Sequence, residues 1–387
     1  MTELIKLHQS FQTRFGNDDK KPDAFFSPGR VNLIGEHTDY NNGFVFPCAL
    51  TYGTYLLIRK NDTGICRFAS DNMTESFEIK TDKLAEKLPG KWVNYPLGVI
   101  DQLKNRGLTP TGWDMLFWGN IPGSAGLSSS ASIETVTAKA LNDAYYLGLE
   151  MIDLVKLSQK AENEFVGVNC GIMDQFAVGM GKKDHAVFLN CETLDYELVP
   201  LVLGDYRIVI MNTNKSRGLA DSKYNERVKE CSQAVDFLSK RKPIGSLGEL
   251  SYQEFVDLKH LIPDITIRKR AKHVVSENQR TLDAVAALKN NNLKTFGQLM
   301  NASHNSLRFD YEVTGNELDA IVEEARMVEG VLGARMTGAG FGGCAVSLVH
   351  KDSVEKFKTH VEKNYTKRTG LKPIFYISEI GDGTKKI

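Results

Sequence analysis

The chain has 387 residues, of which 42% are hydrophobic and 25% are charged, a composition typical of a globular protein. Because a single hydrophobic core rarely grows to this length, we expect two domains with a ligand cleft between them. The formal net charge is +0 and no long block of like charge occurs, so the composition argues against non-specific attraction to nucleic acid or to an anionic membrane.

The sequence also carries no targeting or metal-ligand pattern. The N-terminus lacks the basic and apolar regions of a signal peptide, and no apolar run approaches the ~20 residues of a membrane span. The six cysteines form no Cys-x-x-Cys pair, and the eight histidines show no zinc-ligand spacing. We therefore expect a cytoplasmic monomer with reduced thiols and with neither a membrane nor a nucleic-acid partner.

Hydrophobic periodicity predicts both helices and strands. The first helix is predicted from Leu4 to Phe15 and ends at Gly16. Residues 44–59 predict two strands broken at Pro47 and Gly53. Four later helices are predicted over 130–146, 153–165, 268–289 and 315–329. Three later strands are predicted over 207–212, 344–349 and 373–378. This mixture predicts an α/β or α+β class, with domains 1–205 and 206–387.

A first polar segment runs from Gly29 to Gly43 with the sequence GRVNLIGEHTDYNNG. Charged side chains are rarely buried without partners, so Arg30, Glu36 and Asp39 must face solvent, one another or a ligand. Such a concentration of polar groups suits a site for a polyhydroxylated ligand. A polar loop between two strands is the alternative interpretation.

A second segment, IPGSAGLSSSAS at residues 121–132, stands just before a predicted helix. Small residues at a helix N-terminus expose backbone N–H groups, which favours phosphate binding. Serine is also common as a helix cap, so the segment taken alone has a purely structural interpretation. It is not a Walker A loop, because no Gly-Lys-Ser/Thr follows at the required spacing.

A third segment, GARMTGAGFGGC at residues 333–344, is rich in glycine and leads into a predicted strand. We expect a loop that can approach a ligand closely. A dinucleotide fingerprint follows a strand and opens a helix, so nicotinamide chemistry is disfavoured. Between the second and third segments, Glu162 and Asp174 are candidate bases or metal ligands, although for either residue taken singly a solvated or helix-capping acid is the more common explanation.

The three segments in this order resemble the galactokinase family, within the superfamily of galactokinase, homoserine kinase, mevalonate kinase and phosphomevalonate kinase. Residues 29–43 are similar to the galactokinase signature almost letter for letter. The resemblance runs from about residue 20 to the C-terminus. It implies a two-domain small-molecule kinase with mixed sheets, helices and a C-terminal ferredoxin-like domain. It also implies ATP-dependent phosphorylation of galactose at its anomeric hydroxyl.

The resemblance assigns roles to particular residues. The implied sugar contacts are Glu36, His37, Thr38, Asp39 and Tyr224. Asp174 would face the anomeric hydroxyl, as a base or as an orienting acceptor, with Arg30 stabilising charge on the transferred group. Ser130 and Glu162 would hold Mg²⁺. The implied phosphate contacts are Ser124, Ala125, Gly126, Leu127, Ser128, Ser129 and Ser130. Ser70 is a weaker candidate for nucleotide contact, and Ser124 departs from the glycine that is usual in the family.

Three alternative functions stay open to different degrees. A mevalonate kinase should lack the signature at 36–39 and is therefore disfavoured. An N-acetylgalactosamine kinase differs in the space beside the sugar 2-position, which the sequence does not define. A catalytically silent sugar and ATP sensor would be free to lose Arg30, Asp174 and the serine run, all of which are present.

Overall fold

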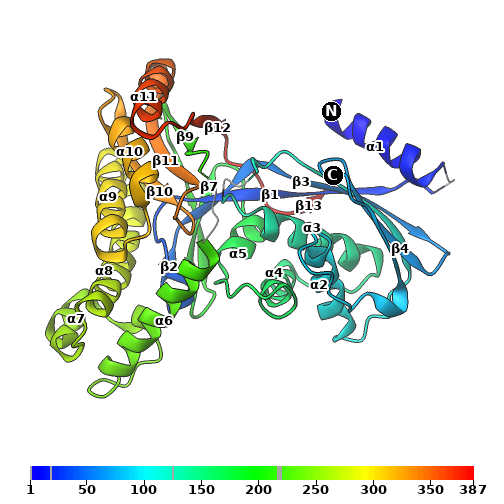
Figure 1. Cartoon of the computed structure of the whole chain (residues 1–387), viewed down its shortest axis with the longest axis horizontal. Helices are drawn as coiled ribbons and strands as arrows, with labels where there is room; N and C mark the ends of the chain where they lie inside the picture. The colour runs from blue at the N-terminus through cyan, green and yellow to red at the C-terminus, as the bar shows by residue number, and fades with distance from the viewer. Residues whose placement is uncertain (1, 18–19, 124–125, 216–219) are drawn as a thin grey trace.

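The computed structural model describes residues 2–17, 20–123, 126–215 and 220–387 (Figure 1). These residues form a six-stranded sheet with the strand order β13-β1-β3-β6-β4-β5. All neighbouring strands are antiparallel except β4 and β6, which are parallel. The strands are β1 (Asp23–Asn32), β3 (Pro47–Asn61), β4 (Ile65–Ser70), β5 (Phe77–Lys80), β6 (Gly112–Gly119) and β13 (Lys385–Lys386).

Helices cover both faces of this sheet. On one face lies α1 (Thr2–Phe15), whose Leu7 and Phe11 are buried against Leu57 and Leu116. The other face carries α2 and α3, with α4 and α5 packed beside them (Figure 1). Their bounds are α2 (Asn94–Lys104), α3 (Ser129–Ala144), α4 (Met151–Lys160) and α5 (Met173–Met180). A smaller, three-stranded sheet packs on α5. Its strands are β2 (Phe44–Val45), β7 (His185–Asn190) and β8 (Tyr196–Pro200).

The second half of the chain forms a four-stranded antiparallel sheet with the order β10-β11-β9-β12. Its strands are β9 (Tyr206–Asn212), β10 (Val331–Thr337), β11 (Cys344–His350) and β12 (Ile374–Ser378). When the strands are numbered 1 to 4 along the chain, their order across the sheet is 4-1-3-2, read from β12, and helices connect β9 to β10 and β11 to β12. This is the split βαβ arrangement of a ferredoxin-like fold, which confirms the expected fold class.

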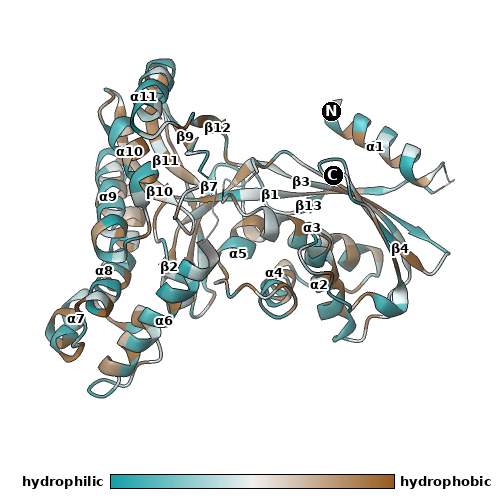
Figure 2. Ribbon diagram, in the orientation of Figure 1, coloured by the Kyte–Doolittle hydropathy of each residue, from teal (hydrophilic) through white to brown (hydrophobic). Residues whose placement is uncertain are grey.

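The remaining helices surround this second sheet at the left of Figure 1. They are α6 (Ala220–Leu238), α7 (Tyr252–Leu258), α8 (Ile265–Lys289), α9 (Leu293–Ser306), α10 (Gly315–Arg326) and α11 (Val354–Thr369). Short turns of other helical type are η1 (Asp39–Asn41), η2 (Thr81–Lys83), η3 (Ala161–Val166), η4 (Leu247–Glu249), η5 (Lys259–Leu261), η6 (Leu307–Tyr311) and η7 (Lys351–Ser353). Apolar and polar residues alternate along the outer helices, as amphipathic packing requires (Figure 2). None of the described helices is both long and apolar enough to cross a membrane.

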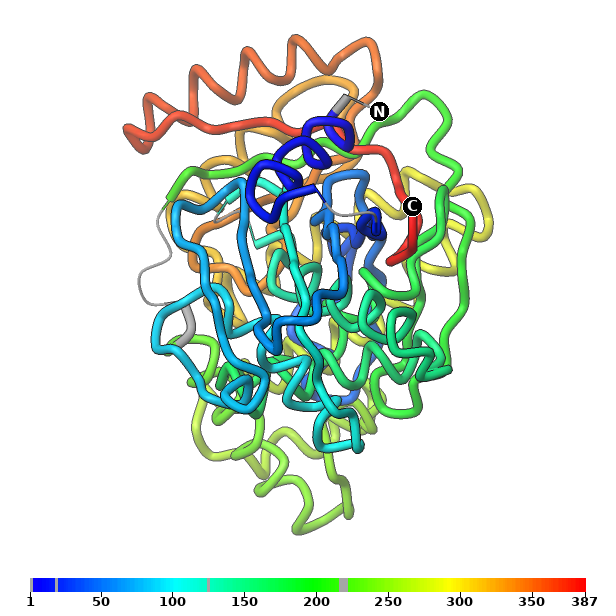
Figure 3. The backbone as a smooth tube through the Cα atoms, turned by 90° about the vertical axis from the view of Figure 1, so that its right-hand side faces the viewer, coloured from blue at the N-terminus to red at the C-terminus, as the bar shows by residue number. Residues whose placement is uncertain are grey.

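The two halves share a hydrophobic core, and the C-terminal strand crosses back to the first sheet. β9 begins at Tyr206, close to the expected boundary, but β13 returns to pair with β1 in the first sheet. The tube view shows this last strand close to the N-terminal helix (Figure 3). One apolar cluster joins both halves, because it contains Val31 of β1 together with Ile210 of β9. A boundary near residue 205 therefore stays a prediction.

Two sequence expectations need correction. Gly53 does not end a strand, since β3 continues from Pro47 to Asn61. Its missing side chain instead lets β3 pass the Phe26 ring and the Ser27 carbonyl of β1, where a Cβ would overlap both. The third segment is not one long loop either: residues 333–337 belong to β10, and the loop is confined to 338–343.

Candidate active site

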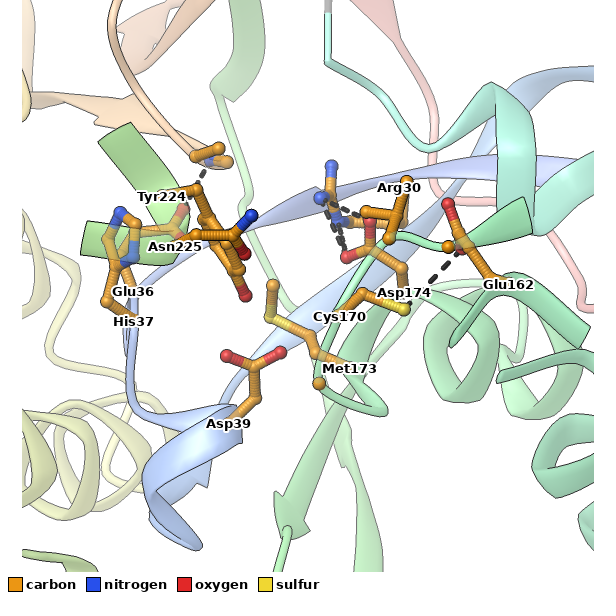
Figure 4. A pocket seen from close by; sticks show the side chains of 15 residues that line it. Arg30, Glu36, His37, Asp39, Glu162, Cys170, Met173, Asp174, Tyr224 and Asn225 are labelled. Carbon is orange, nitrogen blue, oxygen red and sulfur yellow. Dashed lines mark hydrogen bonds and ion pairs between the residues drawn. The ribbon is translucent and has the colours of Figure 1, made fainter. Parts of the chain in front are cut away.

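A cavity of about 380 Å³ opens where the first segment, α5, α6 and the loop after β10 meet. Its volume is in the range of small-molecule sites. Figure 4 shows Glu36, His37, Tyr224 and Asn225 facing Arg30, Asp174 and Glu162 across it. The lining residues are Arg30, Glu36, His37, Asp39, Glu162, Gly167, Val168, Cys170, Gly171, Met173, Asp174, Tyr224, Asn225, Gly338 and Ala339.

Arg30 and Asp174 form a two-pronged ion pair at one end of the cavity. Arg30 Nε donates to Asp174 Oδ1 at 2.8 Å, and its Nη2 donates to Oδ2 at 2.9 Å. The third nitrogen, Nη1, donates to the Gly126 carbonyl at 2.7 Å. Arg30 lies in β1, not in a loop, and its side chain is 5% exposed. A fork of this kind fixes the direction of the carboxylate as well as its charge.

Ser128 adds a third donor to the same carboxylate. Its Oγ donates to Asp174 Oδ2 at 2.7 Å. The residue has φ 60° and ψ 47°, a left-handed conformation that is uncommon outside glycine. Ser128 stands immediately before α3 but makes no side-chain cap, so its side chain serves Asp174 and not the helix. The second segment and Asp174 therefore form one structural unit.

Glu36 is buried at the opposite end of the cavity. It accepts hydrogen bonds from Asn32 Nδ2 at 3.0 Å and from the Gly338 backbone N–H at 2.8 Å. Arg335 Nη1 forms an ion pair with it at 3.3 Å. The first segment is thus connected to β10 and to the loop that follows it. The positive φ of 82° at Gly338 brings that loop to the cavity wall.

The pKa values of His37 and Asp39 are both shifted away from their ordinary values. Burial lowers the pKa of His37 to about 3, so the imidazole is neutral. Burial, followed by the negative charge of Asp174, raises the pKa of Asp39 to about 7. Gly171 lies against the Asp39 carboxylate, where a Cβ would overlap it. The Tyr224 ring from α6 also lines this part of the cavity, with its centroid 5.7 Å from that of His37.

Glu162 lies at the far wall, among other acidic groups. The π-helical segment η3 follows α4 and presents Glu162, which accepts from Gln175 Nε2 at 2.6 Å and from the Ser130 hydroxyl. Burial and then the Asp174 charge raise the pKa of Glu162. Behind it, burial and the Glu162 charge raise the pKa of Glu134 well above its usual range.

The pair Ser130 and Glu162 fits a magnesium ion. Both supply oxygen atoms, and Glu162 stands close to further acidic groups whose repulsion a dication would relieve. Among the described residues no group of three or more histidine, cysteine or acidic side chains could hold a metal alone. Mg²⁺ commonly uses one or two protein ligands together with phosphate oxygens and water.

The second segment is placed partly as expected. Ser129 and Ser130 begin α3, which supports a phosphate site at that helix N-terminus. Leu127 is packed in the apolar core, and its carbonyl accepts from the Arg30 backbone N–H at 3.1 Å. Ser124 and Ala125 lie outside the described residues.

Two candidates lie away from the cavity lining. Thr38 is fully buried, and its hydroxyl faces the Gly35 and Phe44 carbonyls at 2.9 and 2.7 Å. Ser70 ends β4, and its Oγ accepts from the Asn72 backbone N–H at 3.2 Å. In the structure, both hydroxyls serve the backbone.

Sequence reasoning missed several residues of the site. Gln175 follows Asp174 directly and bridges two carboxylates, since its Nε2 also donates to Glu134 Oε2 at 3.2 Å. Glu134 stands one helical turn after Ser130, a spacing that could have placed it on the same face. Cys170 and Met173 line the cavity from the glycine-bounded stretch before Asp174.

Comparison with known proteins first defines the class. Residues 94–182 match the N-terminal domain of the GHMP kinases, and residues 284–367 match their C-terminal domain. The solved structure of Methanococcus jannaschii mevalonate kinase superposes with a TM-score of 0.70, at 19% identity over 94% of this chain and 100% of that one. The fold is therefore that of a GHMP-type small-molecule kinase.

More specific matches identify the family within this class. Residues 9–60 match the galactokinase galactose-binding signature. A galactokinase from Clostridium beijerinckii is 52% identical over the full length of both chains. The structure of Lactococcus lactis galactokinase complexed with galactose superposes with a TM-score of 0.97, at 48% identity and 100% coverage of both chains. The chain belongs to the galactokinase family.

Proposed function

We propose that the chain is an ATP-dependent galactokinase that converts α-D-galactose into galactose 1-phosphate, with ADP as the second product. This is the phosphorylation step of galactose catabolism by the Leloir pathway. The observation that carries the proposal is the Arg30–Asp174 fork at the end of a sugar-sized cavity, in a chain 52% identical to a galactokinase over its full length.

In this proposal the cavity orients the sugar from several sides. Asp39, His37 and Tyr224 contact ring hydroxyls, while Glu36 and Gly338 form the adjoining wall. Asp174 accepts the hydrogen of the anomeric hydroxyl, either as a hydrogen bond or by proton transfer. The anomeric oxygen then forms the new bond to the γ-phosphorus as the bond to ADP breaks. Arg30 stabilises the charge on the transferred group.

The nucleotide is proposed to lie against the N-terminus of α3. Backbone N–H groups of residues 126–130, together with the helix dipole, favour its phosphates. Ser130 and Glu162 would hold Mg²⁺, which supplies charge neutralisation on the phosphates when it is bound. We further propose that the protein is a monomer in the cytoplasm. The six free cysteines support the location.

The test is a coupled assay with ATP, magnesium and one of three sugars. We expect turnover with galactose and very little with glucose, because Asp39 distinguishes an axial from an equatorial hydroxyl at C4. Leaving a buried charged acceptor unpaired costs about 1.5–3 kcal/mol or more. Efficient glucose phosphorylation would overturn the proposal. Faster turnover with N-acetylgalactosamine would instead favour that substrate, and sugar binding without turnover would favour a sensor.

A further inference from the structure

Three consecutive serines at the start of α3 have different surroundings. Ser128 is buried, Ser129 is exposed and Ser130 is half-buried. Ser130 bonds to Glu162 on the proposed magnesium side of the site. The Ser128 hydroxyl instead donates to Asp174 Oδ2 at 2.7 Å. The serine run therefore reaches two different carboxylates, and the hydroxyl of Ser128 serves Asp174.

The backbone of Ser128 has a conformation that glycine would adopt more easily. Its φ of 60° and ψ of 47° are left-handed, and in this conformation a Cβ crowds the carbonyl oxygen that follows it. Glycine has no Cβ and avoids this cost, as Gly126 does at a φ of 70°. A serine at such a position indicates that its side chain has a use. Since this side chain makes no cap at α3, its use in the structure is the bond to Asp174.

Arg30 and Ser128 hold the Asp174 carboxylate from separate segments of the chain. Arg30 belongs to β1, whereas Ser128 is anchored at α3, because its carbonyl accepts from the Ser132 backbone N–H at 3.0 Å. A carboxylate held by one flexible side chain can move together with it. A donor from a second, anchored segment limits that movement. The Asp174 side chain is still 27% exposed, so a ligand in the cavity can reach it.

We propose that Ser128 is a positioning residue, whose hydroxyl holds the Asp174 carboxylate in the orientation that accepts the hydrogen of the anomeric hydroxyl. Ser128 acts through Asp174 and is not among the residues that line the cavity. The effect of Ser128 on turnover rests on the proposed function. The bond between the two side chains does not, and its energetic coupling can be measured without any sugar.

The first test compares Ser128→Gly with Ser128→Ala by steady-state kinetics and thermal denaturation. Both variants lack the hydroxyl, but only alanine keeps a Cβ in the left-handed conformation. We expect both variants to lose about tenfold or more in kcat with galactose, because the carboxylate is less well oriented. The KM for ATP should stay unchanged. Ser128→Ala should also melt at a lower temperature than Ser128→Gly, because glycine accommodates this backbone without strain.

Asp184→Gly is the matched control for the backbone change. Asp184 is also left-handed, with a φ of 61°, but it is exposed and does not line the cavity. This control should keep the kcat of the unmodified protein. An unchanged kcat in a folded Ser128→Gly protein would overturn the proposal. A loss confined to the KM for ATP would also overturn it, because the hydroxyl would then serve the phosphates and not Asp174.

The second test is a double-mutant cycle that needs no sugar. Urea denaturation measures how much Ser128→Gly changes the free energy of unfolding, in the unmodified protein and in Asp174→Asn. The change should be less destabilising in Asp174→Asn, because the bond from the hydroxyl is strongest to a charged acceptor. Equal changes would overturn the proposal. If the unmodified protein does not phosphorylate galactose, the proposed function fails, and this cycle still decides whether Ser128 holds Asp174.

Discussion

The Asp174 carboxylate has little accepting capacity left once its protein partners are counted. A carboxylate offers about four lone-pair positions. Arg30 Nε, Arg30 Nη2 and Ser128 Oγ occupy three of them. One position therefore remains for a ligand hydroxyl on the cavity side. This is the geometry expected of a group that orients a single nucleophile.

Asp174→Asn should reduce turnover by about 10²-fold or more, the usual scale for acid–base groups. The change is nearly isosteric but removes the charge that faces Arg30. Steady-state kinetics with galactose measures the loss, and Asp195→Asn, at an exposed acid bonded to Thr193, is the control. Wild-type turnover in a folded Asp174→Asn protein would contradict the role assigned to Asp174.

Asp39 should make galactose binding depend on pH. Its pKa is raised to about 7, and hydrogen bonds from sugar hydroxyls favour the ionised form. Binding below pH 7 should then release a proton, so affinity should rise by up to about tenfold per pH unit and level off above pH 7. Calorimetry in buffers of different ionisation enthalpy measures this proton. Asp39→Asn should bind more weakly and without the pH dependence, and proton uptake would contradict the assignment.

The same shift has an opposite consequence for the unliganded protein. Because the pKa of Asp39 is higher when folded than when unfolded, its contribution to stability is fully present below about pH 4. That contribution is lost as the pH rises through 7. The free energy of unfolding of the sugar-free protein should therefore fall between pH 5 and 8 by more than that of Asp39→Asn.

At the scale of elements, α5 connects the sugar side of the site with the proposed magnesium side. Consecutive residues of its first turn face different partners: Asp174 meets Arg30, and Gln175 meets Glu162. Gln175 is fully buried. Its amide donates to both Glu162 and Glu134, two carboxyl groups that also hydrogen-bond to each other and would repel if both were ionised.

Gln175→Met should weaken binding of Mn²⁺ with ADP by about tenfold, because Glu162 loses the donor that directs it. Gln102→Met is a matched control: Gln102 is also buried and donates to Glu164 of the same η3 segment at 3.1 Å, but Glu164 does not line the cavity. Electron paramagnetic resonance of Mn²⁺ and thermal shifts with nucleotide read the affinity. Equal losses in the two variants would indicate a general effect on η3.

Local sequence patterns were enough to locate most elements. The predicted helix up to Phe15 is confirmed as α1, because its apolar spacing and the positive φ of Gly16 act within one segment. The helix predicted over 153–165 is split into α4 and η3, since π-helical hydrogen bonds do not alter the apolar periodicity enough to be read. The strand break predicted at Gly53 is wrong, because glycine is needed there to leave room for the neighbouring strand β1.

Only those residues of the site that belong to a recognisable sequence motif could be predicted. The first segment, Asp174 and Glu162 do meet at one cavity, as the resemblance implied. The spacing from Ser130 could place Glu134 on the same helix face, but its bond to Gln175 could not be recognised, because it is defined by packing between α3, η3 and α5. The hydroxyls of Thr38 and Ser70 bond to backbone groups in the structure, and their implied ligand contacts stay predictions.

At the scale of the whole molecule, buried charges connect the two halves. Arg335 of β10 is fully buried and donates to the Asn32 carbonyl at 3.0 Å, beside its ion pair with Glu36. Glu277 of α8 accepts from the Gly35 backbone N–H at 3.0 Å. The first segment is thus held from the second half of the chain, so the position of the sugar site depends on how the halves pack.

Arg335→Met should lower the free energy of unfolding by about 3–5 kcal/mol, the cost of leaving a buried charge without its partner. The replacement fills similar space but leaves the buried Glu36 carboxylate without its cationic partner, with only the donors Asn32 Nδ2 and Gly338 N–H. Arg67→Met is the matched control, since it also removes an arginine from an ion pair with a buried acid, at 2.7 Å from Asp114. Asp114 keeps Arg59 at 3.1 Å and Asn61 at 2.7 Å, so the control should lose less. Urea denaturation followed by fluorescence measures both variants, and a loss in Arg335→Met no larger than that in Arg67→Met would show that this ion pair does not hold the halves together.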